Sequence, residues 1–268
     1  MKSAETLLAC CVVGLACFIG GQSVGARSAV LDEADGTIVA KGARSPLDIA
    51  ERVDDARHGE EVLVTSNTIR RTNGNATATT EDTRRRIASG MAGTYIDELL
   101  TARDSAITRW PDRATRPLRV FVRDGDALEQ WNPDFLPAVR DAFDTWTQAG
   151  IPVRFSFVRD SATADIAVHF VERFANGISG KTVWSRDGSH WLLSSDIQLA
   201  VTHPNGGTVT APQMRAIALH EVGHLLGLDH TASPDNIMSA RVRVRELSEA
   251  DKATVRLVYA VEAGSLKR

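Results

Sequence analysis

Cysteine is nearly absent from this sequence. The 268-residue chain has three cysteines, Cys10, Cys11 and Cys17, and all of them lie near the N-terminus. The rest of the chain therefore has no disulfide, no thiolate metal ligand and no cysteine nucleophile. Any chemistry that it performs must use other side chains.

A basic excess and repeated apolar runs are missing as well. Lysine and arginine number 31 against 34 aspartates and glutamates, which argues against a nucleic-acid-binding protein because such proteins usually carry a basic excess. One long apolar run is present, Leu7–Ile19, and this excludes a multi-span membrane protein. The composition, 43% hydrophobic and 24% charged, is that of a soluble globular protein of one or two domains.

Residues 1–26 have the layout of a secretory signal. Lys2 precedes the apolar run, and Val24-Gly25-Ala26 has the small residues of a signal cleavage site. A single uncleaved membrane anchor is the alternative, because the apolar and small residues approach the roughly 20 needed to span a bilayer. Leu15-Ala16-Cys17 also resembles a lipoprotein cleavage site. A cleaved signal, an uncleaved anchor and a lipoprotein signal all predict a secreted, cell-surface or periplasmic protein.

Residues 106–268 show alternating strand-like and helix-like patterns. Their order, a strand, a helix, several strands and two helices, predicts an α+β (mixed) fold class. The predicted strands cover 118–122, 153–158, 164–170, 181–184 and 196–201, and the predicted helices cover 133–149, 211–226 and 247–259.

The strongest chemical signal is His220-Glu221-x-x-His224-x-x-Gly227-x-x-His230. Two histidines four residues apart project from one face of a helix, and both can reach a zinc ion at about 2.0–2.1 Å. Gly227 lets the chain leave the helix with a positive φ, which brings His230 back as a third ligand. Three protein ligands with one open position are typical of a catalytic zinc site, and Glu221 is the expected general base.

This motif, followed by Met238, resembles the metzincin zinc peptidases, and the short gap after His230 is similar to that of the matrixin branch. The resemblance covers residues 106–268. It implies a metzincin-like catalytic domain with a twisted, roughly five-stranded mixed sheet, three helices and a Met-turn, preceded by a partly helical N-terminal segment. It also implies that Met238 forms a hydrophobic base beneath the zinc. Further matches are Trp110-Pro111, Ala164-Asp165-Ile166 and Leu247-Ser248-x-x-Asp251.

In the family, the substrate lies extended along an edge strand of the sheet. The candidate positions for that strand are Lys181, Thr182, Val183 and Trp184. For Trp184, packing in the core is an equal alternative. By resemblance, Asp165 is a candidate ligand for a structural Ca2+ ion.

The sequence also departs from the family. Many matrixins keep themselves latent with a propeptide cysteine on the zinc, and no cysteine follows Cys17 here. Ser239-Ala240 stands where many members have Tyr-Pro, so the depth of their substrate pocket cannot be assumed for this protein. His190 and Asp187 lack the spacing of the second, structural zinc of vertebrate members, so we expect a surface or core role for them.

Residues 27–105 lie outside the resemblance and have two alternative roles. They form either a propeptide that blocks the catalytic cleft or a stalk or packing segment. A short helix over 47–56, a short strand over 61–65 and a helix from Glu81 to Ser105 are predicted, with a polar linker over 72–80. Because the last helix runs almost directly into the catalytic part, packing is favoured.

The predicted function is that of an exported zinc endopeptidase acting on protein or peptide substrates, with Glu221 as the base that takes a proton from a zinc-bound water. One alternative is a zinc-holding surface binding or adhesion module without turnover. The intact Glu221 argues against it, because a pure binding module needs no base. Another is hydrolysis of a non-protein amide, such as a cell-wall peptide link, at the same site.

Overall fold

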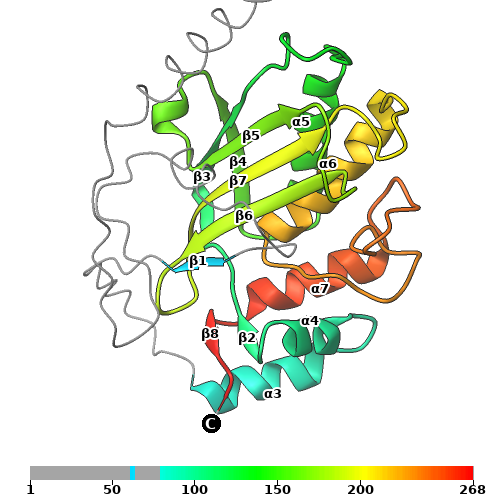
Figure 1. Cartoon of the computed structure of the whole chain (residues 1–268). Coiled ribbons are helices and arrows are strands. Elements are labelled where there is room, and N and C mark those ends of the chain that lie inside the picture. The colour runs from blue at the N-terminus through cyan, green and yellow to red at the C-terminus, as the bar shows by residue number, and fades with distance from the viewer. Residues whose placement is uncertain (1–60, 64–78, 268) are drawn as a thin grey trace, which may run out of the picture. The chain divides into compact units, whose positions relative to one another are not determined.

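The computed structural model describes residues 61–63 and 79–267 (Figure 1). The predicted N-terminal signal or anchor and the predicted helix over 47–56 lie outside these residues. The strands are β1 (Glu61–Leu63), β2 (Ala106–Ile107), β3 (Arg113–Val122), β4 (Val153–Val158), β5 (Ile166–Val171), β6 (Gly180–Arg186), β7 (Leu192–Ala200) and β8 (Gly264–Ser265). The helices are α3 (Thr80–Gly90), α4 (Ile96–Ala102), α5 (Phe135–Thr147), α6 (Ala211–Leu225), α7 (Glu249–Ala260) and the short 3-10 helix η1 (Ser161–Thr163).

The main sheet has the strand order β1-β6-β7-β5-β3-β4. Strands β4, β3, β5 and β7 run parallel to one another, whereas β6 runs antiparallel to β7. The five predicted strands are all present, and the sheet is mixed, so the α+β (mixed) prediction is confirmed. The short strand β1 adds a sixth member, parallel to β6, with Glu61 opposite Trp184 and Leu63 opposite Arg186.

Helices α5 and α6 lie together on one face of the main sheet (Figure 1). Large apolar side chains of α5 fill the space between the two helices and the sheet, and Phe143 and Trp146 are completely buried there. The indole Nε1 of Trp146 donates to the carbonyl oxygen of Leu219 in α6, 2.8 Å away. This bond ties α5 to the middle of α6, the helix that carries the histidine motif.

The two C-terminal helices, α6 and α7, begin within two residues of their predicted starts at 211 and 247. Thr210 and Gln213 form a capping box at the start of α6, with Pro212 in its first turn. Ser248 and Asp251 form a second capping box at the start of α7. The boundaries of these helices follow from local hydrogen bonds, which is why the sequence alone could predict them.

The prediction of one continuous helix from Glu81 to Ser105 is wrong. The chain forms two helices, α3 and α4, joined by a turn in which the amide of Thr94 donates to the carbonyl of Met91 at 3.1 Å. Gly93 has a φ of 74° in this turn, a conformation that ends a right-handed helix. Both helices pack against α7 below the main sheet (Figure 1).

A second, two-stranded sheet joins the segment after α4 to the C-terminal segment of the described chain. Strand β2 pairs antiparallel with β8, and the amide of Leu266 donates to the carbonyl of Ser105 at 2.7 Å. No helix among the described residues is long and apolar enough to cross a membrane.

Candidate metal centre

Helix α6 is buried on nearly all sides over its second half, which is why its sequence lacks a clear polar face. His220, Glu221 and His224 are 7%, 4% and 3% exposed, respectively. The indole Nε1 of Trp110 donates to the carbonyl of Leu225 at 2.9 Å and satisfies one of the last carbonyls of the helix. The imidazoles are therefore held on a helix that is fixed at its middle and at its end.

The turn after α6 returns the chain toward the helix, as the sequence predicted. Gly227 has a φ of 95°, and a Cβ at this position would collide with the carbonyl oxygen of Thr108. The amide of Leu228 donates to the carbonyl of Gly223 at 3.0 Å, which closes the helix end. This turn places His230 beside the two helical histidines.

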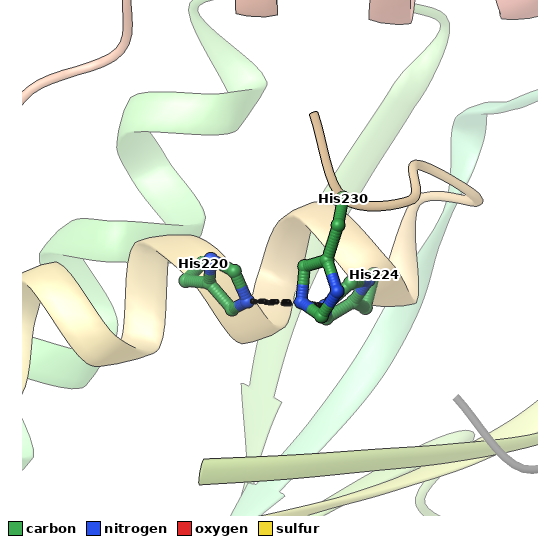
Figure 2. Close-up of side chains that lie close together, drawn as sticks. All are labelled: His220, His224 and His230. Carbon is green, nitrogen blue, oxygen red and sulfur yellow. Dashed lines mark hydrogen bonds between the residues drawn. The ribbon is translucent and has the colours of Figure 1, made fainter. Parts of the chain in front are cut away.

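The three histidine side chains converge on one point (Figure 2). The Nε2 atoms of His220 and His224 are 3.1 Å apart, those of His220 and His230 are 3.2 Å apart, and those of His224 and His230 are 3.3 Å apart. Three nitrogens bound tetrahedrally to one zinc at about 2.0–2.1 Å are separated by about 3.3–3.4 Å. The spacing of the three nitrogens therefore fits a zinc ion.

Backbone carbonyls fix the tautomer of the two helical histidines. The Nδ1 of His220 lies 2.8 Å from the carbonyl oxygen of Ile237, and the Nδ1 of His224 lies 3.0 Å from that of Leu228. A carbonyl only accepts, so each Nδ1 carries the proton and each Nε2 presents a lone pair to the centre. Burial, and the nearness of His220 and His230, lower the pKa of His224 well below its usual value. Nitrogen lone pairs that point toward one position favour a cation at that position.

Met238 is completely buried and packs against α6 between the two helical histidines. A Cβ at Gly223 would collide with the Sδ atom of Met238 and would lie 3.2 Å from the indole of Trp146. The glycine inside the motif therefore makes room for the methionine. The role of Gly223 is not visible in the sequence, because a glycine within a helix gives no sign of which distant side chain lies against it.

Glu221 lies under strand β6. Its Oε2 accepts a hydrogen bond of 2.6 Å from the hydroxyl of Thr182, and that hydroxyl also lies 3.1 Å from the carbonyl oxygen of Glu221. A Cβ at Gly180 would collide with the Glu221 carboxylate, so the strand approaches the helix closely only because this residue is glycine. Burial raises the pKa of Glu221 to about 7, and the hydrogen bond from Thr182 opposes the rise.

The four candidate positions for the substrate strand, residues 181–184, all lie in β6. The side chain of Thr182 points to Glu221, which the sequence did not reveal. Trp184 is 1% exposed and lies beneath the guanidinium of Arg103, 4.8 Å from its ring centre. Its alpha carbon is paired with that of Glu61 of β1. Trp184 is therefore a buried residue of the domain, and residues 181–183 precede the stretch that pairs with β1.

The remaining candidate ligands lie apart from the three histidines. Asp165 receives bonds from the backbone amide, the Nε and the Nη2 of Arg119 at 2.8–3.1 Å, so an arginine occupies both carboxylate oxygens. His190 lies 3.4 Å from the hydroxyl of Thr108 through its Nδ1. In the part of the chain that the structure describes, the three histidines of the motif form the one group of three or more acidic, cysteine or histidine residues that could hold a metal. The calcium site stays a prediction.

The family comparison agrees with this geometry. The profile of the peptidase family described as Matrixin matches residues 126–260, about half of the chain. The chain belongs to the matrixin family. Membership of this family implies zinc, and the three histidines that converge here lie within the matched residues. The matrixin prediction from the sequence is confirmed.

Curated relatives of this matrixin include plant enzymes. Metalloendoproteinase 1-MMP of Arabidopsis thaliana is 28% identical over 139 residues, which are 47% of this chain and 38% of the relative. Metalloendoproteinase 1 of Glycine max is 26% identical over 147 residues, 47% of this chain and 46% of the relative. The matched region thus spans less than half of either relative. The crystal structure of myroilysin aligns with a TM-score of 0.39 and 14% identity over 57% of this chain and 86% of that chain.

Proposed function

We propose that this matrixin is an exported zinc endopeptidase that hydrolyses peptide bonds of protein or peptide substrates. The observation that carries the proposal is the convergence of the His220, His224 and His230 Nε2 atoms to within 3.3 Å of one another, with the buried Glu221 on the same helix as His220 and His224. The names of the plant relatives support the same activity.

The zinc ligands in this proposal are His220, His224 and His230. When bound, zinc acts as a Lewis acid that polarises a substrate carbonyl and lowers the pKa of a water molecule. The residues of the chain then have separate tasks. The carboxylate of Glu221 accepts the proton of the attacking water and returns it to the leaving amine. The hydroxyl of Thr182 holds that carboxylate in one orientation.

Met238 supports the ligands from below. Its side chain lies against Gly223, one residue before His224, and its own carbonyl accepts a hydrogen bond of 3.0 Å from the amide of Thr231, one residue after His230. A buried thioether against the helix gives the ligands an apolar floor and adds no competing donor.

An extended peptide substrate is proposed to add to β6 along Lys181, Thr182 and Val183, next to Glu221. The side of β6 that faces away from β7 pairs with β1 at Trp184, Ser185 and Arg186, so residues 181–183 precede that pairing. Strand addition at these positions would bring the scissile bond beside the carboxylate.

The test uses the purified full-length protein with an unstructured protein such as casein. We expect cleavage that stops with a chelator and returns with zinc, and we expect Glu221→Ala to keep zinc while its rate falls at least about a thousandfold, because the base and the water it orients are lost together. Zinc binding without any cleavage would instead support a binding module. Cleavage of amide-linked cell-wall fragments but not of casein would support the non-protein amide alternative.

Export is proposed from residues 1–26, which have the layout of a signal. Mass spectrometry of the protein recovered from the culture medium and from membranes gives its N-terminus. A mature N-terminus near Arg27 supports signal cleavage, and an intact N-terminus in the membrane fraction supports an anchor. Retention of the whole chain in the cytoplasm would contradict both.

A further inference from the structure

The residues on either side of His230 are held by helix α4 and the residue that follows it. Glu98 of α4 accepts two hydrogen bonds from the segment directly after His230. Its Oε1 accepts from the hydroxyl of Thr231 at 3.1 Å, and its Oε2 accepts from the backbone amide of Ala232 at 2.7 Å. One carboxylate therefore fixes the two residues that follow the third histidine.

Arg103, at the end of α4, contacts the two residues that precede His230. Its Nε lies 2.7 Å from Oδ2 of Asp229, whose Oδ1 accepts from the amide of His230 at 2.8 Å. Its Nη2 lies 3.5 Å from the carbonyl of Leu228, the same oxygen that accepts from Nδ1 of His224. The Arg103 side chain is 11% exposed, so this ion pair is largely shielded from water. Arg103 thus reaches two of the three histidines through one intervening residue each, His230 through Asp229 and His224 through Leu228.

Tyr95, just before α4, reaches the remaining histidine through two buried links. Its hydroxyl donates to Oδ1 of Asp251 at 3.0 Å, and Oδ2 of Asp251 accepts from the amide of Ile237 at 2.9 Å. The carbonyl of Ile237 accepts from Nδ1 of His220 at 2.8 Å. Tyr95 is 5% exposed and Asp251 is completely buried. The chain of contacts from α4 therefore leads to each of the three histidines.

The helical pair is also fastened to the C-terminal end of the domain. The guanidinium of Arg84 donates to the carbonyl of Leu266, and the amide of Tyr95 donates to the hydroxyl of Thr254 at 3.1 Å. A Cβ at Gly90 would lie 2.8 Å from a methyl group of Leu257, so α3 and α7 are in close contact. These contacts give α4 a fixed base from which it can hold the metal loop.

We propose that Tyr95, Glu98 and Arg103 are positioning residues of the zinc site, and that residues 79–105 remain with the catalytic domain when the enzyme is mature. The inference rests on the proposed zinc site. All three residues lie outside the stretch that matches the matrixin profile, 126–260. Groups that orient metal ligands from the second layer typically change metal affinity 10- to 100-fold when removed. Glu98 and Arg103 each act through one further residue and Tyr95 acts through two, so we expect the lower end of this range.

The test compares three variants of the full-length protein. Glu98→Ala removes both hydrogen bonds to the metal loop. Glu98→Gln is the conservative variant, because an amide can accept from Ala232 and donate to the Thr231 hydroxyl. Asp97→Ala is the matched control, since it removes a carboxylate from the neighbouring exposed position of the same helix. Zinc dissociation constants are measured by competition with a chelating dye, and the visible spectrum of the cobalt-substituted protein reports the geometry of the ligands.

We expect the zinc dissociation constant of Glu98→Ala to rise about 10-fold and its cobalt spectrum to change. We expect Glu98→Gln and Asp97→Ala to stay within about twofold of the unsubstituted protein. A purely structural role would lower the melting temperature of the metal-free Glu98→Ala protein and leave the dissociation constant of the folded protein unchanged. That result would overturn the inference.

Two further results keep this inference separate from the proposed function. An unsubstituted protein that does not bind zinc would overturn the proposed function, and this inference with it. An unsubstituted protein that binds zinc, together with a Glu98→Ala variant that binds equally tightly, would overturn this inference alone. Should Glu98→Ala fail to fold, Tyr95→Phe serves as the second variant, because it removes a single buried oxygen and its hydrogen bond to Asp251. A secreted form that begins after residue 105 and binds zinc as tightly as the full chain would also contradict it.

Discussion

The hydroxyl of Thr182 donates to the carboxylate of Glu221 over 2.6 Å, across 39 residues of sequence. This bond joins the strand nearest the proposed substrate to the proposed catalytic base. Both side chains are buried, with 1% and 4% exposed, so water does not easily replace the missing partner when either is removed. The bond therefore has a measurable effect on the acidity and orientation of the base.

Thr182→Val removes this hydrogen bond while keeping the shape of the side chain. A hydrogen bond to a charged group is worth about 1.5–3 kcal/mol, so we expect kcat to fall at least about tenfold with the zinc content unchanged. Because the Thr182 bond lowers the pKa of Glu221, its loss raises that pKa, and the acid limb of the kcat/KM profile moves to higher pH. Thr182→Ser keeps the hydroxyl and is the control. An unshifted acid limb in the valine variant would contradict this prediction.

In the metal-free protein, the buried Glu221 makes a contribution to stability that falls as pH rises. Its carboxyl group ionises near 4.5 in the unfolded chain and near pKa 7 in the folded chain, so the folded chain binds more protons between these values. The contribution of Glu221 therefore falls from about pH 4.5 to about pH 7 and stays lower above it. Glu221→Gln has no carboxyl group to ionise at this position. We therefore expect the difference in unfolding free energy between the variant and wild type to grow by about 3 kcal/mol in favour of the variant across that interval. Urea unfolding of chelator-treated protein at several pH values measures the difference, and a difference independent of pH would refute the assignment.

Gly223→Ala should destabilise the protein, although alanine favours helices over glycine by about 1 kcal/mol. The added methyl group collides with Met238 and lies 3.2 Å from Trp146, and overpacking of this kind costs about 1–3 kcal/mol. Gly188→Ala is the control, since no atom lies within 4 Å of a Cβ there. Urea unfolding with excess zinc compares the two. Equal stabilities would show that the methionine does not lie against the helix in this way.

Zinc should stabilise the folded protein through the three histidines. At a free zinc concentration about 100 times the dissociation constant, binding adds about 2.7 kcal/mol to the unfolding free energy, so a chelator should lower the melting temperature. His230→Ala removes one ligand and should abolish most of this zinc-dependent shift. Differential scanning calorimetry of both proteins, with and without chelator, provides the comparison. An unchanged shift in the variant would exclude His230 as a ligand.

The sequence was informative wherever the relevant interactions are local. The capping boxes at Thr210 and Ser248 were predictable because each involves residues three positions apart. The placement of His220 and His224 on one face follows from the helical repeat, and the return of His230 follows from the positive φ of Gly227. These features, together with the strand patterns, predicted the α+β fold and the candidate metal site.

Other features depend on segments that are far apart in the sequence. The break between α3 and α4 was missed, because the apolar residues Ile87, Met91, Tyr95 and Leu99 recur at helical spacing on both sides of Gly93 and hid the turn. The contact of Gly223 with Met238 and that of Thr182 with Glu221 join different elements, and no periodicity encodes such pairs.

The candidate zinc ligands of this matrixin could be recognised from the amino-acid sequence, because their spacing on one helix and one turn is a local property. The contacts that hold those ligands in place were visible only in the folded protein. Glu98 and Arg103 lie more than 100 residues before the loop that they contact, and the packing of α4 beside α7 brings them to it. Packing between distant segments depends on the whole folded chain, and short-range patterns carry no record of it.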